Sequence, residues 1–315
     1  MISRWKRILI TWWAGFIWSN LVRKLVNLGF SDIHLILRYE SDTWRINDIL
    51  SKLHIHYWSL TDSVFVEKCV YDSKPDVIYH LAAHWVSGER SSIVDLFNNN
   101  INWTINLISA CEKVWFEYFV NTWTNFEYWE KKNPFSESDV LEPNNEYAVS
   151  KASTTLYASC VWKNKWLPIY TYRLFSLYWP YETSVRLIPS LMLSYIKNIQ
   201  PHLSKPDFVR DFIYIDDVTN YYLNVDLIEW DFWWIYNIWT WKQYSIWEIV
   251  DYIKDISNST IEPIYGTMPT KRKELWMYMA DTNKLYKTFN IKQRTIFEWL
   301  EETYERFKKN ISLYK

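Results

Sequence analysis

The stretch Arg7-Ile-Leu-Ile-Thr-Trp-Trp-Ala-Gly-Phe-Ile-Trp18 decides the fold of this chain. Its short apolar run, Ile8–Ile10, predicts a buried strand that ends at Thr11. After a tight connection, apolar residues recur at helical spacing from Phe16, and Gly29 closes that pattern. A strand, a turn and a helix at the start of a chain are where an α/β nucleotide-binding fold has its phosphate loop.

Short apolar strands alternate with helical patterns through the first half of the chain, which predicts a Rossmann-type, doubly wound parallel sheet with helices on both faces. After about residue 175 the alternation loosens, so we expect a dinucleotide-binding domain at 1–175 and a smaller α/β substrate lobe at 176–315, folded onto it without a linker. Strands are expected at Ile8–Ile10, Ile33–Leu37, His54–Tyr57, Asp76–Tyr79, around Phe119-Val120 and at Ile169–Arg173, with an extended Phe208–Ile215; helices are expected at 43–52, 62–72, 90–113, 144–164, 185–198, 216–225, 244–256, 281–288 and 294–309.

The composition excludes several classes of protein. The formal net charge is -1 over 315 residues, without a basic or acidic tail, which argues against a nucleic-acid or membrane partner. No apolar run approaches about 18 residues, so no membrane span is expected, and the chain begins without a signal-peptide pattern. The odd set Cys69, Cys111 and Cys160 indicates reduced interior thiols of a cytoplasmic protein, not a disulfide framework or a metal site.

The abnormal feature of the composition is 22 Trp against 4 Gly. Average usage would give about 22 Gly in a chain of this length, and the two residue types together number 26. Many tryptophans stand where turns favour glycine, as in Tyr178-Trp179-Pro180 and Trp239-Thr240-Trp241. We infer that most of them replace glycines, because the aromatic residues of a naturally Trp-rich sugar binder would gather on one face.

The pair in Tyr147-Ala-Val-Ser-Lys151 carries the chemistry. Residues four apart share one face of a helix, so the phenol and the ammonium lie one turn apart. A nearby cation stabilises a phenolate and lowers the pKa of the tyrosine from its usual value near 10. Such a tyrosine can take or give the proton of a carbinol while hydride moves at the same carbon. The pattern alone is common by chance, but here it follows the fifth expected strand of the sheet.

Further motifs follow in a fixed order along the chain, and with the opening stretch they resemble the extended short-chain dehydrogenases, a family of nucleotide-sugar epimerases, dehydratases and reductases. The resemblance covers about residues 5–310. The family loop reads Thr-Gly-x-x-Gly-Phe-Ile-Gly, so of its three glycines this chain keeps Gly15 and has Trp12 and Trp18 at the others. The other motifs are His80-Leu-Ala-Ala83, Asn98-Asn-Asn-Ile-Asn-Trp-Thr104, Asn121-Thr-Trp-Thr-Asn-Phe-Glu-Tyr-Trp129, Arg173-Leu-Phe-Ser-Leu-Tyr-Trp-Pro180 and Arg210-Asp-Phe-Ile-Tyr-Ile-Asp-Asp217.

The resemblance implies a role for each matching residue. The catalytic set is Thr124, which aligns with the Ser/Thr that bonds the reacting sugar oxygen, with Tyr147 and Lys151; Thr122 is the alternative to Thr124. Cofactor contacts are implied for Thr11, Gly15, Phe16, Ile17, Arg38, Ser59, Leu60, Leu81, Ala82, Ala83, Asn100 and Phe175, together with Tyr147 and Lys151. Substrate contacts are implied for His84, Thr124, Ser176, Arg186, Arg210 and Arg272. His80 is assigned no chemistry.

Two positions bear on the reaction. The family's 4,6-dehydratases follow their catalytic Thr with Asp-Glu, whereas this chain has Asn125-Phe126, so dehydration is not expected. Members that prefer NAD usually have Asp where Arg38 stands, at the end of the second strand. A guanidinium there can bind the 2′-phosphate of NADP, helped by Ser41 or Arg45, although a solvated Arg is the alternative. We therefore expect NADP or NAD, with NADP favoured.

The leading hypothesis is an NAD(P)-dependent nucleotide-sugar epimerase or reductase, and we favour a 4-ketoreductase of a nucleotide deoxysugar. The first alternative is a nucleotide-sugar 4-epimerase that retains NAD. The second is a non-catalytic scaffold whose dinucleotide site is blocked by Trp12 and Trp18, since glycine at these positions lets the backbone approach the pyrophosphate. The resemblance further implies a homodimer.

Overall fold

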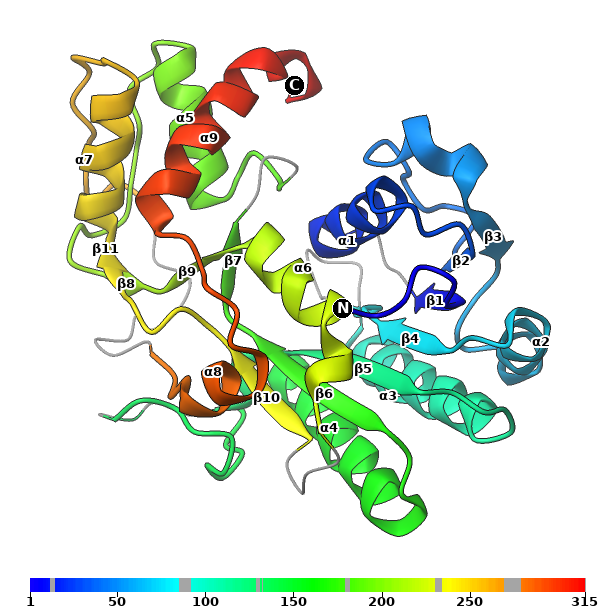
Figure 1. The fold of residues 1–315 in the computed structure, drawn as a ribbon. Helices are drawn as coiled ribbons and strands as arrows, with labels where there is room; N and C mark the ends of the chain where they lie inside the picture. The colour runs from blue at the N-terminus through cyan, green and yellow to red at the C-terminus, as the bar shows by residue number, and fades with distance from the viewer. Residues whose placement is uncertain are drawn as a thin grey trace.

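The computed structural model describes residues 1–11, 15–84, 92–128, 131, 133–178, 182–229, 234–268 and 279–314. Its centre is a seven-stranded sheet in the order β10-β6-β5-β4-β1-β2-β3, in which every neighbouring pair is parallel (Figure 1). The chain winds outward from β1 in both directions, so the predicted doubly wound Rossmann-type sheet is confirmed. The strands are β1 (Ile8–Thr11), β2 (Ile33–Leu37), β3 (His54–Tyr57), β4 (Val77–His80), β5 (Tyr118–Thr124), β6 (Ile169–Leu174) and β10 (Ile235–Ile238).

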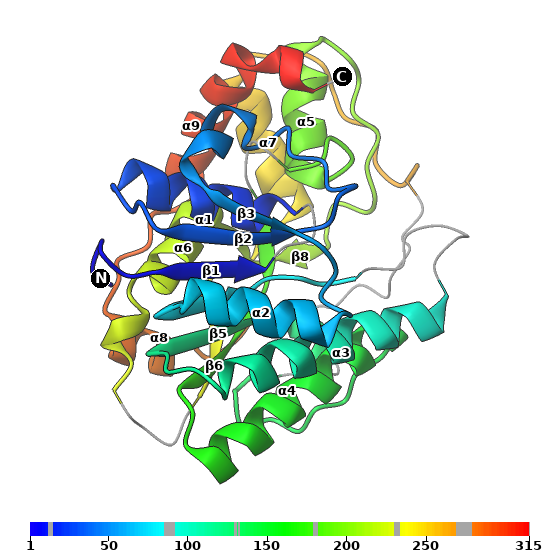
Figure 2. The same cartoon turned by 90° about the vertical axis from the view of Figure 1, so that its right-hand side faces the viewer.

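Helices cover both faces of this sheet because successive side chains of each strand point to opposite sides. Ile8 and Ile10 of β1 belong to a core shared with α1 (Phe16–Asn27) and α6 (Ile215–Leu223), whereas Leu9 belongs to a second core on the other face. That second core packs under α2 (Ser63–Ser73), α3 (Ile93–Cys111) and α4 (Glu146–Lys165). In Figure 2, α2, α3 and α4 lie in front of the sheet, and α1 and α6 lie behind it. The fully apolar runs of the strands follow from this burial on both sides.

The C-terminal part of the chain forms a group of helices beside the sheet and also adds β10 to it. Figure 1 shows α5 (Leu187–Ile196), α7 (Ile246–Ile256) and α9 (Ile296–Lys309) together at the upper left. This part of the chain also contains two-stranded sheets that are separate from the seven-stranded one. The remaining elements are β7 (Ser176–Tyr178) paired with β9 (Phe212–Tyr214), β8 (Val209–Arg210) paired with β11 (Tyr244–Ser245), and α8 (Asn283–Phe289). The boundary at residue 175 stays a prediction.

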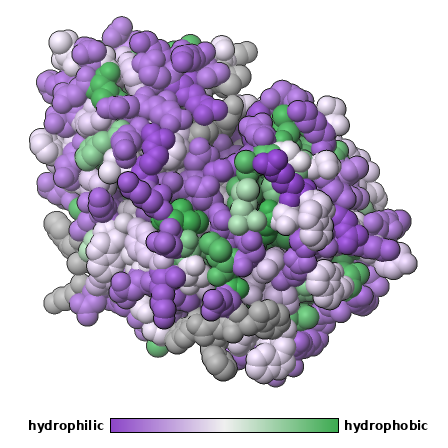
Figure 3. Space-filling view, in the orientation of Figure 1, coloured by the Kyte–Doolittle hydropathy of each residue, from purple (hydrophilic) through white to green (hydrophobic). Residues whose placement is uncertain are grey.

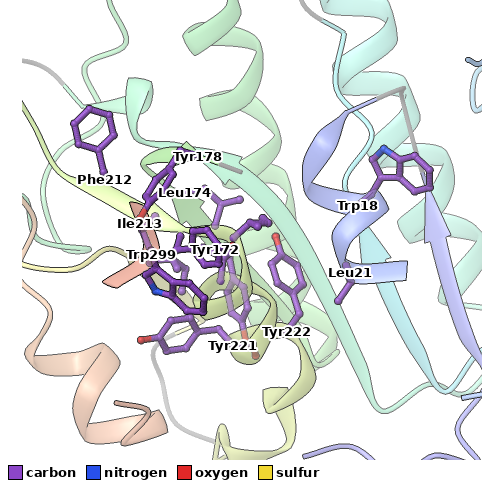
Figure 4. Packing of buried hydrophobic residues seen from close by; sticks show 14 of the residues in the cluster. Trp18, Leu21, Tyr172, Leu174, Tyr178, Phe212, Ile213, Tyr221, Tyr222 and Trp299 are labelled. Carbon is purple, nitrogen blue, oxygen red and sulfur yellow. The ribbon is translucent and has the colours of Figure 1, made fainter. Parts of the chain in front are cut away.

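Aromatic packing joins the sheet to this second part. Tyr172 of β6 meets Tyr222 of α6 edge to face, with ring centroids 5.2 Å apart. The hydroxyl of Tyr79 in β4 donates to the Tyr222 carbonyl at 2.8 Å. Farther along, Tyr214 stacks on Trp299 of α9 with centroids 3.7 Å apart. Figure 4 shows Tyr172, Tyr222 and Trp299 gathered between β6, α6 and α9. Because such rings bury large areas, they account for much of the contact between the two parts.

Two expectations from the sequence are wrong. The α-helix expected at 43–52 is a single 3-10 segment, η1 (Asn47–Lys52), since few apolar residues there form a helical stripe. Cys69 and Cys111 are buried as expected, but Cys160 is exposed because it lies on the outer side of α4. Within the described ranges, no helix is long and apolar enough to cross a membrane.

Among the residues that the structure describes, two tryptophans adopt a backbone conformation that favours glycine. Trp166, the C-cap of α4, has φ 56°, and Trp241 has φ 68°. The left-handed region costs a residue with a Cβ about 1–2 kcal/mol. Both indoles are largely solvent-exposed, 62% for Trp166 and 44% for Trp241, so burial offsets little of this cost. The observation supports our inference that tryptophans stand at glycine positions in this chain.

Replacing Trp166→Gly is therefore expected to raise the free energy of unfolding by about 1 kcal/mol, as glycine is the usual residue at such a C-cap. Urea unfolding followed by circular dichroism measures the change. The matched control is Trp115→Gly, because Trp115 is 69% exposed and is not among the residues with positive φ. The control should be neutral or destabilising; an equal gain in both variants would contradict the assignment of strain to Trp166.

Candidate active site

The site lies where β1, β4 and β5 end at their carboxyl edge, the right-hand edge of the sheet in Figure 2. The Leu81 amide donates to the Thr11 carbonyl at 3.3 Å, which joins the ends of β4 and β1. Between them His80 is fully buried, with Nδ1 2.6 Å from Thr11 Oγ1 and Nε2 3.0 Å from Thr104 Oγ1. Burial, with a smaller effect of the Lys151 charge, lowers the pKa of His80 to about 3. The imidazole is therefore neutral and structural, in keeping with the prediction that it does no chemistry.

The start of α1 offers backbone donors to an anion. Gly15 is the N-cap, and the helix has no side-chain cap and no acidic residue in its first turn. Its first N–H groups consequently have no intrahelical partner, which suits the diphosphate of a dinucleotide. Trp18, in the same turn, is only 1% exposed and belongs to the core between α1 and the sheet (Figure 4). Trp12 lies outside the described residues.

Tyr147 and Lys151 lie on the first turns of α4, whose N-cap Asn145 accepts from the Ala148 amide at 2.9 Å. Lys151 is 1% exposed. Its ammonium is 3.3 Å from the ring centroid of Trp123 in β5 and 5.8 Å from that of Tyr147. Burial holds the pKa of Lys151 well below its usual value, opposed by the charge of Glu127. Tyr147 and Lys151 thus share one face of α4, as predicted. The Lys151 ammonium makes its nearer ring contact with the indole of Trp123.

The two candidate threonines of β5 differ in their surroundings. Thr122 Oγ1 is 2.7 Å from the Tyr222 hydroxyl, inside the core between β5 and α6. Thr124 ends the strand, where its hydroxyl accepts from the Phe126 amide at 3.3 Å and lies 3.5 Å from Asn125 Oδ1. The position at the strand end favours Thr124 over Thr122 as the group that meets a substrate.

Asn100 of α3 ties the segment after β4 to the helix of Tyr147. Its amide accepts from the His84 backbone N–H at 2.6 Å and donates to the His84 carbonyl at 3.0 Å and to Ser150 Oγ at 2.9 Å. Burial first, and then the charge of Arg38, lowers the pKa of His84. Arg38 at the end of β2 therefore lies within electrostatic reach of His84. His84 therefore lies near both Arg38 and Asn100 at the carboxyl edge of the sheet.

The groups proposed to help Arg38 have other contacts. Ser41 Oγ accepts from the Arg38 backbone N–H at 3.1 Å, in a turn that also brings the Ser41 amide to the Arg38 carbonyl. Arg45 is 8% exposed, and its guanidinium lies 4.4 Å from the ring centroid of Trp44. Arg38 itself is half-buried, so it is the better placed of the two arginines for a ligand at this edge.

The other predicted residues are distributed over both parts of the chain. Phe16 and Ile17 open α1, and Leu81, Ala82 and Ala83 follow β4 directly. Ser59 and Leu60 follow β3; the Leu60 carbonyl accepts from Asn106 of α3 at 2.9 Å. Phe175 is buried against Trp239, with ring centroids 3.5 Å apart, and Ser176 begins β7. Arg186 is the N-cap residue of α5, and its guanidinium lies 3.8 Å from the Glu182 carboxylate. Arg210 lies in β8 and donates to the Val209 carbonyl. Arg272 lies outside the described residues.

A buried ion pair between Glu127 and Arg173, next to the helix of Tyr147 and Lys151, was not predicted from the sequence. Glu127, in η2 (Asn125–Glu127), accepts from Arg173 Nε of β6 and from Thr155 Oγ1 of α4, both at 3.0 Å. Arg173 also bonds the Tyr128 hydroxyl, which donates to Asn237 of β10 at 3.0 Å. Burial would lower the pKa of Arg173, but Glu127 and Tyr128 outweigh it and raise that pKa. The signal in the sequence was Arg173, a charge inside the otherwise uncharged strand Ile169–Leu174, which requires a buried counterion.

The doubly wound sheet, with the start of α1 and the Tyr-Lys helix α4 at the carboxyl edge of its strands, has the architecture of Rossmann-type proteins. A family model described as the NAD dependent epimerase/dehydratase family matches residues 8–225. The chain therefore belongs to the NAD-dependent epimerase/dehydratase family, which confirms the predicted family, and the family's cofactor is NAD.

Relatives and solved structures agree with this placement. The chain is 24% identical over 227 residues to a probable dTDP-glucose 4,6-dehydratase of Sinorhizobium fredii, a match that covers 67% of this chain and 65% of the relative. It is 24% identical to the mouse dTDP-D-glucose 4,6-dehydratase over 98% of this chain and 91% of that protein. The Thermotoga maritima UDP-glucose 4-epimerase, solved with UDP-glucose, superposes with a TM-score of 0.81 at 22% identity, covering 97% and 99% of the chains. A putative epimerase of Burkholderia cenocepacia gives 0.85 at 21% identity, covering 98% and 100%.

The ion pair of Glu127 makes a direct prediction. Glu127→Gln leaves the buried Arg173 charge without its counterion and is expected to lower the free energy of unfolding by about 3 kcal/mol. Chemical denaturation measures the loss. The control is Glu67→Gln, which removes the exposed pair with Lys113 and should change stability by less than about 1 kcal/mol. Equal losses in the two variants would refute a special role for the buried pair.

Proposed function

We propose that this chain catalyses hydride transfer at a hydroxyl or keto carbon of a nucleotide-activated sugar, with Tyr147 as the acid/base. The observation that carries the proposal is the Tyr147–Lys151 pair at the end of β5, on the same edge of the sheet as the uncapped start of α1. Family membership supports the use of NAD or NADP. The names of the relatives, which are 4,6-dehydratases and 4-epimerases, support a nucleotide sugar as substrate.

Each residue has a distinct part in the proposed reaction. Tyr147 gives a proton to the carbonyl oxygen during reduction, or takes it from the hydroxyl during oxidation. The Lys151 ammonium would stabilise the phenolate by its charge, and Thr124 would donate a hydrogen bond to the reacting oxygen. The first turn of α1 would hold the diphosphate of the cofactor, and Arg38 its ribose end. When bound, the nicotinamide supplies or accepts the hydride.

Within this class we favour a 4-ketoreductase of a nucleotide deoxysugar. Elimination of water needs an acid and a base beside the reacting carbon, and the residues after Thr124 are Asn125 and Phe126, which cannot titrate. Arg38 at the end of β2 suits NADP, the cofactor that a reductase consumes. A 4-epimerase with retained NAD is the alternative, and its hydride steps would use the same Tyr147.

Product analysis separates these reactions. The chain is incubated with NADPH and a nucleotide 4-keto-6-deoxyhexose, and separately with NAD and a UDP-hexose. Stoichiometric loss of NADPH with formation of a deoxyhexose supports the reductase. Interconversion of hexoses without net change of cofactor would overturn the reductase in favour of the epimerase, and formation of a 4-keto-6-deoxy product would overturn both.

Removal of the Tyr147 hydroxyl tests the acid/base assignment. Tyr147→Phe keeps the ring and is expected to lower kcat by about 10²–10⁴-fold, the usual contribution of a positioned proton donor. The control is Tyr157→Phe, because Tyr157 lies on the same helix and packs against the core between α4 and the sheet. Comparable losses in the two variants would mean that the helix, not the hydroxyl, is responsible.

A second candidate function is a folded scaffold that binds no cofactor. It is favoured by the Trp18 indole, buried in the turn where glycine lets a helix approach a strand and a diphosphate. The contact of the Lys151 ammonium with the indole of Trp123 also favours a scaffold. In this case the family residues would be present but unused.

The double substitution Trp12→Gly with Trp18→Gly decides between these two functions. If indoles block the loop, the unaltered chain binds NADP weakly, and the double variant should bind at least tenfold tighter. A cofactor titration followed by tryptophan fluorescence measures both affinities, with Trp115→Gly as the control for loss of an exposed indole. Micromolar binding by the unaltered chain would refute the block.

The resemblance and the buried thiols support a further part of the proposal, that the chain works as a homodimer in the cytoplasm. Light scattering on the purified chain tests the dimer.

A further inference from the structure

Three histidines and an aspartate cluster at the edge of the sheet opposite the candidate active site. Asp32 and His34 stand at the start of β2, and His54 and His56 at the start of β3. Residues two apart in a strand share a face, and the parallel register pairs His34 with His54. All three imidazoles therefore lie on the face of the sheet that α2 covers. β2 and β3 are the last two strands of the sheet, so an ion can reach the cluster from the side of the sheet.

The side chains of this cluster are within contact of one another. His34 Nε2 is 2.8 Å from Asp32 Oδ1, and His54 Nε2 is 3.9 Å from the same oxygen. The rings of His34 and His54 are stacked, with centroids 4.7 Å apart. One ligand atom from each of Asp32, His34 and His54 lies within 4.8 Å of the other two. On its other side, His34 Nδ1 is 2.9 Å from His56 Nε2.

We propose that Asp32, His34 and His54 bind one divalent transition-metal ion of the Zn²⁺ type, with His56 as the hydrogen-bond partner that orients His34. Two imidazoles and a carboxylate are a zinc ligand set with a fourth, open position for water. Bond lengths of about 2.0–2.1 Å in a tetrahedron put ligand atoms about 3.3 Å apart. The contacts of 2.8 and 3.9 Å bracket that separation, so shifts of a few tenths of an ångström suffice for these two pairs.

The surroundings suit a cation. The carboxylate of Asp32 lies against ring nitrogens of His34 and His54, and His34 and His56 face α2. The groups that face them from α2 are Lys68 and Asp72, which pair with each other, and the Arg7 charge also reaches His34. The His56 contact fixes the His34 ring through its second nitrogen, as is usual for histidines bound to metals.

A metal at this place would act on the fold and not on the reaction. It would cross-link β2 to β3, the strand at the end of the sheet, which has a partner on one side only. An ion that binds the folded state alone stabilises it by mass action. No metal site was expected from the sequence, because these residues come together only when β2 pairs with β3.

Calorimetric titration of Zn²⁺ into the full chain tests the proposal. We expect one ion per chain and a rise of the Tm on its addition. His54→Ala and Asp32→Asn should weaken binding at least tenfold, and His56→Ala about tenfold through the lost orientation of His34. The side chains of His54 and Asp32 are 59% and 41% exposed, so these variants should fold, which circular dichroism checks.

The matched controls are His202→Ala, another exposed histidine, and Cys160→Ser, the exposed thiol. Both should bind Zn²⁺ as the unaltered chain does. The visible absorption of Co²⁺ bound in place of Zn²⁺ should be lost in His54→Ala. Absence of saturable binding, or equal affinity in His54→Ala and the unaltered chain, would overturn the site.

Discussion

The buried carboxylate of Glu127 is the constraint on which the candidate active site depends. It accepts hydrogen bonds from Thr155 of α4 and from Arg173 of β6. The helix that carries Tyr147 and Lys151 is thereby fixed against the end of the sheet, and Arg173 extends the link through Tyr128 to β10. Breaking one member would leave a charge in the core, so the arrangement is stable only as a whole.

The same carboxylate favours the charged form of Lys151. Burial keeps His80 neutral and holds the pKa of Lys151 well below its usual value, and the charge of Glu127 opposes the shift at Lys151. A cation beside a phenol is what the proposed proton transfer requires. In this chain the ammonium lies on the indole of Trp123, a cation–π contact that competes with the hydroxyl of Tyr147 for the charge. Two tryptophans therefore affect the site, Trp18 by its bulk at the start of α1 and Trp123 by its contact with the Lys151 charge.

Much of the fold was predictable because its signals are local. The apolar run Ile8–Ile10 and the helical spacing after Phe16 predicted β1 and α1, and α4 was expected within two residues of its observed bounds. Contacts between distant segments were not predictable. The pairing of β10 with β6, the burial of Glu127 with Arg173, and the grouping of Asp32 with His54 depend on register in the assembled sheet. The candidate site shows the same division: Tyr147 and Lys151 share a face as their spacing predicts, but the indole over Lys151 comes from another strand.

A crystal structure of the chain with NADP bound tests the central claim most directly, that the start of α1 and the Tyr147–Lys151 pair form one cofactor site. The account predicts the diphosphate at the N-terminus of α1, after Gly15, and the nicotinamide beside the Tyr147 hydroxyl. A dinucleotide bound elsewhere, or one whose nicotinamide lies away from Tyr147, would contradict it.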